Sequence, residues 1–494
     1  MLNIRKFCGI FLIFTLVLAC NLPVNHPYTG ISPILTATAA ARLASPISTN
    51  DSFNILSAGN KYIYTIQSGD TLSIISTRFS IGVEDLVRQN PTIEQKNLAG
   101  TLMGGESLII PLPATINWNE QVIILDDACF VYGPSEINFN LENYLQSRSG
   151  WISNYIDESG GITVSGLQII RSTAENYSIS PKVLLALLEY ELHAISSPQV
   201  PASFSLGNNE PARKTLGKQL SWAANILNNG YYGWREGKLL EFSDSSGKQI
   251  RPNPANTAAS VGLMYYFSRF LSGYELNKAI SADGFLATYS ALYNENGSKK
   301  DSEINLIPAN LSQPDLTLPL QPGLKWAFTG GPHSGWGTGY PFAAVDFAPP
   351  SEIAGCDPSP YWVTALADGV ISRVDVGSLT LDLDKDGHSE TGWTIRYLHI
   401  AMDRTFSVGT SVSKGEYLGH PSCLGGSSSG RNVHIARLYN GEWIPAGGAI
   451  PLNLGGWVVS NGEKEYKGYL TKEDKSLSSS SSGEWFSQLP EQDK

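Results

Sequence analysis

The stretch GGPHSGWGTGYPFAAVDFA, residues 330–348, carries a histidine and an aspartate on either side of a glycine-rich turn. These are His333 and Asp346, thirteen residues apart. Two further histidines follow: His399 lies in the apolar run RYLHI, and His434 lies within GRNVHIARLYNGEW. Two imidazoles and one carboxylate are a standard ligand set for Zn²⁺, which leaves a fourth position open for a catalytic water. The last third of the chain is therefore predicted to hold a metal site.

The order of these motifs resembles that of the lysostaphin-type zinc peptidases, and among them the beta-lytic branch. The resemblance covers residues 324–470. It implies that His333, Asp346 and His434 bind Zn²⁺ and that His399 works beside the metal. In such a site the metal acidifies a water molecule and polarises the scissile carbonyl, while a neighbouring imidazole can shuttle a proton.

One position departs from the family. Two residues before the last ligand the family has a histidine, whereas this chain has Asn432. An amide can donate a hydrogen bond to a developing oxyanion, but it cannot exchange a proton near pH 7. His399 and Asn432 are thus the expected catalytic pair, and two functions stay open. One is a slow zinc endopeptidase; the other is a non-hydrolytic, wall-binding scaffold or hydrolase activator.

The pattern around these motifs is that of short strands separated by glycine turns, as in SLTLDLD, TGWTIRYLHI and NVHIARLYN. Such a pattern without a long helix predicts an antiparallel β-rich domain over residues 324–471. Because residues two apart on a strand share one face, Asn432 and His434 are expected to point the same way. In an oxidising compartment we expect a disulfide between Cys356 and Cys423, which both fall in predicted loops of this domain.

The N-terminus predicts export. Arg5 and Lys6 precede an apolar run of twelve residues, too short to span a bilayer, so residues 1–19 are predicted to be a signal peptide. The sequence Val-Leu-Ala-Cys ending at Cys20 resembles a bacterial lipobox, which implies lipidation of that cysteine and a membrane anchor. Residues 20–60, rich in Thr, Ala, Ser and Pro, are predicted to be a flexible tether.

Length and composition fit a multidomain exported protein. A chain of 494 residues is too long for one hydrophobic core, and 48 glycines with 28 prolines favour a loop-rich protein. Without residues 1–19 the formal charge is 32 − 45 = −13, since two of the 34 basic residues lie there. An acidic exported protein is a poor candidate for binding nucleic acid.

Residues 61–112 begin with an alternating run, YIYTI, that SGD interrupts. Leu72, Ile75 and Phe79 then fall at helical spacing, and a second short helix and a closing strand follow. This β-α-α-β order, with SGDTL opening the first helix and QNP closing the second, resembles a LysM domain. The resemblance implies binding to N-acetylglucosamine-containing glycans such as peptidoglycan.

Residues 130–304 have helical periodicity. The segment SISPKVLLALLEYEL resembles the lead-in to the active-site helix of lysozyme-like transglycosylases, with Glu191 in the place of the general acid. The serine and the Gly-Leu-Met-Gln signature expected after it are missing, so the sequence favours a spacer or glycan-gripping domain over an active glycosidase. Its aromatic residues could form a stacking surface or belong to the core; they are Trp222, Tyr231, Tyr232 and Trp234.

Residues 305–323 are predicted to be a proline-rich linker, and residues 472–494 a disordered tail. The sequence thus predicts a multidomain α+β protein with a small β-α-α-β domain, a helical, lysozyme-like middle and a β-rich metallopeptidase domain. The function that it favours is a membrane-anchored, cell-wall-associated zinc endopeptidase. Such an enzyme would cut the stem or cross-bridge peptides of peptidoglycan while its LysM domain holds the glycan.

Overall fold

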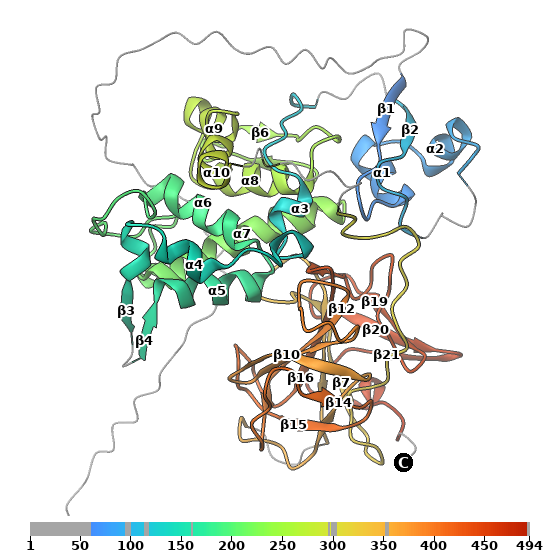
Figure 1. Ribbon diagram of the computed structural model, residues 1–494. Coiled ribbons are helices and arrows are strands. Elements are labelled where there is room, and N and C mark those ends of the chain that lie inside the picture. The colour runs from blue at the N-terminus through green and yellow to red at the C-terminus, as the bar shows by residue number, and fades with distance from the viewer. Residues whose placement is uncertain are drawn as a thin grey trace, which may run out of the picture.

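The computed structural model describes residues 61–93, 100–112, 118–159, 162–294, 297, 304–350 and 355–491. The predicted signal peptide, the predicted lipidation site at Cys20 and the predicted tether lie outside these ranges. The described chain forms an N-terminal unit, a helical unit and a β-rich unit, which run from blue through green to orange and red in Figure 1. Within the described ranges, no helix combines the length and the apolar character needed to cross a membrane.

The N-terminal unit has the predicted β-α-α-β order. Strand β1 (Lys61–Thr65) pairs antiparallel with β2 (Ser107–Pro111), and helices α1 (Leu72–Phe79) and α2 (Val83–Gln89) lie between them in sequence. The Thr71 hydroxyl accepts a hydrogen bond from the Ile74 amide and so caps α1. The apolar residues at helical spacing are fully buried; they are Leu72, Ile75 and Phe79.

The helical unit is built around a 20-residue helix, α7 (Leu216–Arg235). Around it lie α3 (Asp127–Phe130), α4 (Leu141–Gln146), α5 (Gly166–Tyr177), α6 (Pro181–Leu192), α8 (Ala258–Ser268), α9 (Gly273–Ile280) and α10 (Phe285–Tyr293). Two hairpins accompany them, β3 (Ile156–Ser159) with β4 (Ile162–Ser165) and β5 (Phe242–Ser243) with β6 (Gln249–Ile250). Short 3₁₀ turns lie at Pro134–Glu136, Trp151–Asn154 and Pro211–Arg213.

The aromatic residues of α7 belong to the core. Tyr231, Tyr232 and Trp234 are at most 2% exposed, and Trp222 packs against the same core from a partly buried position. The prediction that these aromatic residues form a stacking surface is therefore wrong, and the alternative, that they belong to the core, is confirmed. Cys129 is buried in the same unit.

The β-rich unit contains one large antiparallel sheet with the order β14-β10-β11-β12-β16-β8-β7, and β17 pairs with β16. Its strands are β7 (Ala327–His333), β8 (Ala344–Ala348), β10 (Gly369–Asp375), β11 (Ser378–Asp382), β12 (Trp393–Leu398), β14 (Ser411–Val412), β16 (Val433–Tyr439) and β17 (Glu442–Trp443). A three-stranded sheet joins β13 (Ile400–Ala401), β15 (Tyr417–Pro421) and β9 (Val363–Thr364). A four-stranded sheet contains β18 (Asn453–Leu454), β19 (Trp457–Asn461), β20 (Gly468–Lys472) and β21 (Lys475–Ser478).

Two segments differ from their predictions. The predicted linker is partly core, because Leu316, Leu318 and Leu320 are buried in the β-rich unit. The predicted disordered tail is ordered as far as residue 491: β21 pairs with β20, and a 3₁₀ turn follows at Trp485–Ser487. Beyond it Leu489 is 1% exposed, and its amide donates to the carbonyl of Trp326 at 2.8 Å.

The three units pack together at the end of α7. Arg235 donates to the carbonyl of Ser68 in the N-terminal unit at 2.8 Å. The same guanidinium lies 3.0 Å from Asp127 in the helical unit and 3.4 Å from Glu442 in the β-rich unit. One charged group thus joins all three units.

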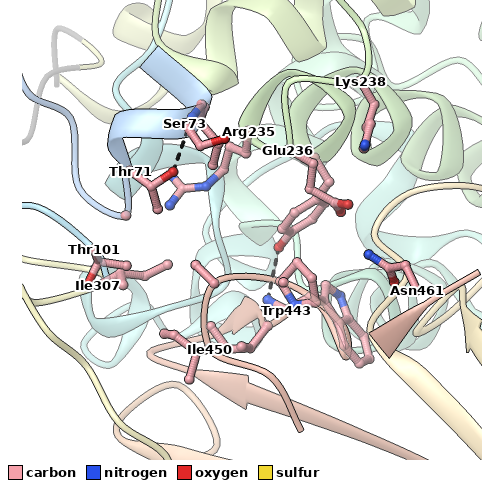
Figure 2. A pocket seen from close by; sticks show the side chains of 17 residues that line it. Thr71, Ser73, Thr101, Arg235, Glu236, Lys238, Ile307, Trp443, Ile450 and Asn461 are labelled. Atoms are coloured by element: carbon pink, nitrogen blue, oxygen red, sulfur yellow. Dashed lines mark hydrogen bonds between the residues drawn. The ribbon is translucent and has the colours of Figure 1, made fainter. Parts of the chain in front are cut away.

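A cavity of about 340 Å³ lies at this junction. In Figure 2, Thr71 of the N-terminal unit, Glu236 from the end of α7, and Trp443 and Asn461 of the β-rich unit all border it. Burial raises the pKa of Glu236 to about 7, against the opposing effect of Lys238. The walls of this cavity therefore come from segments that are far apart in sequence.

Candidate metal centre

Four adjacent strands of the large sheet bring the predicted site residues together. In the order β12-β16-β8-β7, His434 on β16 lies directly opposite Asp346 on β8, and Leu398 at the end of β12 lies opposite His434 on the other side. His333 ends β7. His399 follows β12 directly and has a positive φ of 64°. The register of the sheet therefore gathers residues that are up to 101 positions apart.

The three predicted ligands face one another. His333 Nε2 lies 3.3 Å from Asp346 Oδ1 and 3.0 Å from His434 Nδ1. His434 Nδ1 lies 3.3 Å from the same carboxylate oxygen. All three side chains are largely buried, and within the described chain Asp346 Oδ1 has no hydrogen-bond donor. A glycine is required opposite the carboxylate, since a Cβ on Gly330 would lie 2.5 Å from Asp346 Oδ2.

The outward hydrogen bonds of the two imidazoles define their tautomers. His333 Nδ1 lies 2.9 Å from the Gly331 carbonyl, and His434 Nε2 lies 3.2 Å from the Gly335 carbonyl. A carbonyl oxygen can only accept, so these ring nitrogens are the donors. In the neutral rings the two nitrogens that face each other then both carry lone pairs. Two lone pairs and an unpaired carboxylate oxygen are what a bound Zn²⁺ requires, so the residues fit the metal.

The electrostatics of the group favour a cation as well. Burial lowers the pKa of His434 to about 4, which keeps that ring neutral. Burial alone would raise the pKa of Asp346 and lower that of His333. The pairing of the two reverses both effects, so the pKa of Asp346 lies well below its usual range and that of His333 is raised. A proton and a metal ion therefore compete for His333.

A cavity of about 350 Å³ opens over the three ligands. His399 lies in its wall and donates from Nδ1 to the Leu424 carbonyl at 2.8 Å, so in the neutral ring Nε2 is the acceptor. Burial lowers the pKa of His399 and favours that neutral form.

Tyr466 is a further residue of the site that was not predicted from the sequence. Its ring stacks on His333 with centroids 4.2 Å apart and also lines the cavity. Burial raises its pKa to about 12, so its hydroxyl stays protonated. Tyr466 lies in a segment, NGEKEYKGY, that has no histidine or other ligand pattern to mark it.

Asn432 also lines this cavity, but its amide hydrogens point elsewhere. Its Nδ2 donates to Ser428 Oγ at 2.9 Å and to the Gly430 carbonyl at 3.0 Å. Its Oδ1 is buried and has no donor in the described chain. The residue lies directly before β16, where it forms an isolated antiparallel bridge with Ser422. Asn432 and His434 line the same cavity, as the strand alternation predicts. Asn432 thus holds the loop that walls the cavity.

The structure has a disulfide between Cys356 and Cys423, with Cα atoms 5.1 Å apart. The residues on either side of Cys423 both contact His399: Ser422 donates to its carbonyl from both N and Oγ, and Leu424 accepts from its ring. The disulfide therefore fixes the segment that orients the predicted catalytic imidazole.

Replacing both cysteines, Cys356→Ala with Cys423→Ala, is expected to lower the free energy of unfolding by about 2–4 kcal/mol, because the bridge closes a long loop. Turnover should fall as His399 loses its fixed segment. Zinc content should not change, since none of the three ligands lies on that segment. Denaturant unfolding and metal analysis measure the two effects. Free thiols at both positions in the exported wild type would show that this disulfide does not form.

Glu191 lies in the last turn of α6 and is not among the residues that line the cavity over the three ligands. Its Oε1 is buried without a donor in the described chain, and burial raises its pKa from 4.5 to about 7. A raised pKa suits a general acid, but it also means that ionisation destabilises the fold.

Because the folded-state pKa of Glu191 is the higher one, the wild type is expected to lose stability as pH rises from 4.5 through about 7. Glu191→Gln should remove this loss and be about 2 kcal/mol more stable than wild type at pH 8. The two proteins should differ little at pH 4. Melting temperatures across this range provide the measurement. A variant that unfolds earlier than wild type at pH 8 would mean that the carboxylate has a stabilising partner when ionised.

Two parts of this chain match known protein families. Residues 64–111 match the family described as LysM domain, and residues 123–307 match the family described as LasA, N-terminal domain. Two relatives named Protease LasA come from Pseudomonas aeruginosa strains ATCC 15692 and UCBPP-PA14. Each is 24% identical over 363 residues, which cover 69% of this chain and 79% of the relative.

Solved structures with similarity include the M23 metalloprotease pseudoalterin from the deep sea, with 26% identity and a TM-score of 0.28 over 34% of this chain and 96% of that one. The catalytic domain of lysostaphin from Staphylococcus simulans is 22% identical, with a TM-score of 0.17, over 25% of this chain and 89% of that one. The chain thus carries a LysM domain and is similar to a protease over most of its length. The sequence around Glu191 predicts a lysozyme-like fold for the helical unit. The family that matches this unit is the one described as LasA, N-terminal domain.

Proposed function

We propose that this protein is a zinc metalloendopeptidase of the cell wall that cuts stem or cross-bridge peptides of peptidoglycan. The observation that carries the proposal is the convergence of His333, Asp346 and His434, with two ring lone pairs and an unpaired carboxylate oxygen turned inward. The similarity to Protease LasA supports a peptidase, and the LysM domain supports a substrate that contains glycan.

The residues around the ligands suit peptide hydrolysis. When bound, Zn²⁺ supplies Lewis acidity that polarises the scissile carbonyl and acidifies water. His399 is neutral at pH 7 and presents Nε2 as a proton acceptor beside the ligands. Tyr466 keeps its hydroxyl proton and can donate a hydrogen bond to an oxygen that becomes negative. The roles of His399 and Tyr466 rest on their proximity to the three ligands, since all five residues line one cavity.

We also propose that the protein acts outside the cytoplasm, anchored to the membrane by lipid on Cys20. The LysM match supports a location at the wall, because a domain that binds glycan raises the local concentration of the peptidase on its substrate. Labelling with a radioactive fatty acid, which Cys20→Ser should abolish, tests the anchor independently of the peptidase.

The test of the peptidase is the release of free amino groups from purified sacculi. We expect release by the full chain, loss of release with a zinc chelator, and recovery when Zn²⁺ is added back. A chain that binds Zn²⁺ at this site and releases nothing would be a wall-binding protein without peptidase activity.

Asn432 supports that second candidate, a non-hydrolytic peptidoglycan-binding scaffold or hydrolase activator. Its amide hydrogens are engaged by Ser428 and Gly430, so it offers the reacting centre neither a proton carrier nor a ready donor. The two candidates differ in one measurement, because a scaffold binds sacculi through its LysM domain and leaves their peptides intact.

A further inference from the structure

Residues 334–343 connect β7 to β8, and hence His333 to Asp346. The loop of residues 334–340 within this connection borders the cavity over the ligands. On its inner side the Gly335 carbonyl accepts the Nε2–H of His434. That bond keeps the proton on Nε2 and so turns the Nδ1 lone pair toward Asp346. The position of this carbonyl therefore favours the tautomer in which His434 can bind a metal through Nδ1.

On its outer side the loop is held by the helical unit. Asn225 and Asn229, one turn apart on α7, both bond to the backbone of the loop. Asn225 accepts from the Thr338 amide at 2.8 Å and donates to the Thr338 hydroxyl at 3.2 Å. Asn229 accepts from the Tyr340 amide at 3.0 Å and donates to the Thr338 carbonyl at 2.8 Å. Both ends of both amides are used.

The loop is shaped for this contact. Gly337 and Gly339 both have φ near +80°, a conformation that side chains rarely adopt. A Cβ on Gly337 would lie 2.3 Å from Asn225 Oδ1, and one on Gly339 would lie 2.0 Å from Asn229 Oδ1. The loop thus has glycine at the two points where the asparagines approach it.

We propose that Asn225 and Asn229 are positioning residues for the metal centre, through the chain of contacts from α7 to the loop, and from Gly335 to His434. The helical unit then completes the zinc site from outside the β-rich unit. This inference rests on the proposed function only in taking the three-residue group as a zinc site. Outer groups that orient a ligand typically affect metal affinity by 10–100-fold.

The experiment is zinc affinity of the full chain, measured by competition with a chromogenic chelator. Asn225→Ala with Asn229→Ala is expected to bind Zn²⁺ about 10–100-fold more weakly. Lys218→Ala, an exposed change on the same helix, is the matched control and should bind as wild type. Asn225→Asp keeps the acceptor for the Thr338 amide and should lose less affinity than Asn225→Ala. Gly339→Ala disturbs the same contact from the loop side and should weaken zinc binding too.

A second readout does not depend on metal. In metal-free protein the double variant should be cut faster by chymotrypsin after Trp336, at the centre of the loop, than wild type or Lys218→Ala. If the double variant binds Zn²⁺ with wild-type affinity, the inference is wrong and the proposed peptidase activity is unaffected. If the variant binds Zn²⁺ more weakly but the wild type does not cleave sacculi, the inference holds and the proposed peptidase activity is wrong. A wild type that binds no Zn²⁺ would overturn both.

Discussion

Asp346→Asn is expected to abolish tight zinc binding and to lower peptide cleavage by at least about 10³-fold, because Lewis acidity is worth several kcal/mol of transition-state stabilisation. The substitution keeps the shape of the side chain but removes the charge that both imidazoles face. The fold should persist, since Asp346 Oδ1 has no donor to lose within the described chain. Metal analysis after dialysis and the sacculus assay measure the two losses.

His388→Ala is the matched control, because His388 is an exposed histidine of the same unit. Zinc content and cleavage should both equal those of wild type. If Asp346→Asn still holds one equivalent of zinc with wild-type affinity, the metal lies elsewhere and the assignment of the three ligands is wrong.

The sequence identified the parts of the molecule whose signals are local. The spacing of Leu72, Ile75 and Phe79 predicts α1, and all three side chains are buried in the structure. The structure also brings together His333, Asp346, His434 and His399, as the resemblance implies. The order of the motifs along the chain was enough to predict this group of residues, although the sheet register could not be predicted from the sequence.

Features that depend on distant contacts were mispredicted or missed. Lys475–Ser478 is polar and rich in serine, so it resembles a tail, yet it becomes a strand through backbone pairing with β20. Tyr466 acquires a role only where the chain returns beside His333. The contact of α7 with the loop at Thr338 joins residues more than 100 positions apart. Its side chains are asparagines and a threonine, which have no sequence signature for metal binding.

The asparagine at position 432 decides how fast the proposed enzyme works. A family peptidase has a second imidazole there, and losing one general acid–base group typically costs about 10²–10⁴-fold in rate. Asn432 could compensate for the missing imidazole by donating a hydrogen bond to the substrate. In the structure its amide hydrogens are instead donated to Ser428 and Gly430. His399 is then left as the proton carrier, with Tyr466 as a hydrogen-bond donor.

Asn432→His is therefore expected to raise turnover on sacculi by about 10²–10⁴-fold while zinc content stays the same, because Asn432 is not in the ligand group. The loop at Ser428 should lose about 1 kcal/mol per hydrogen bond removed, a cost that Asn432→Ala shares. That alanine variant is the control: it loses the same bonds, gains no imidazole and should not turn over faster. A wild type that already cleaves rapidly and is slowed by Asn432→His would make Asn432 an adapted catalytic group. The loop contacts would then have to rearrange when substrate enters.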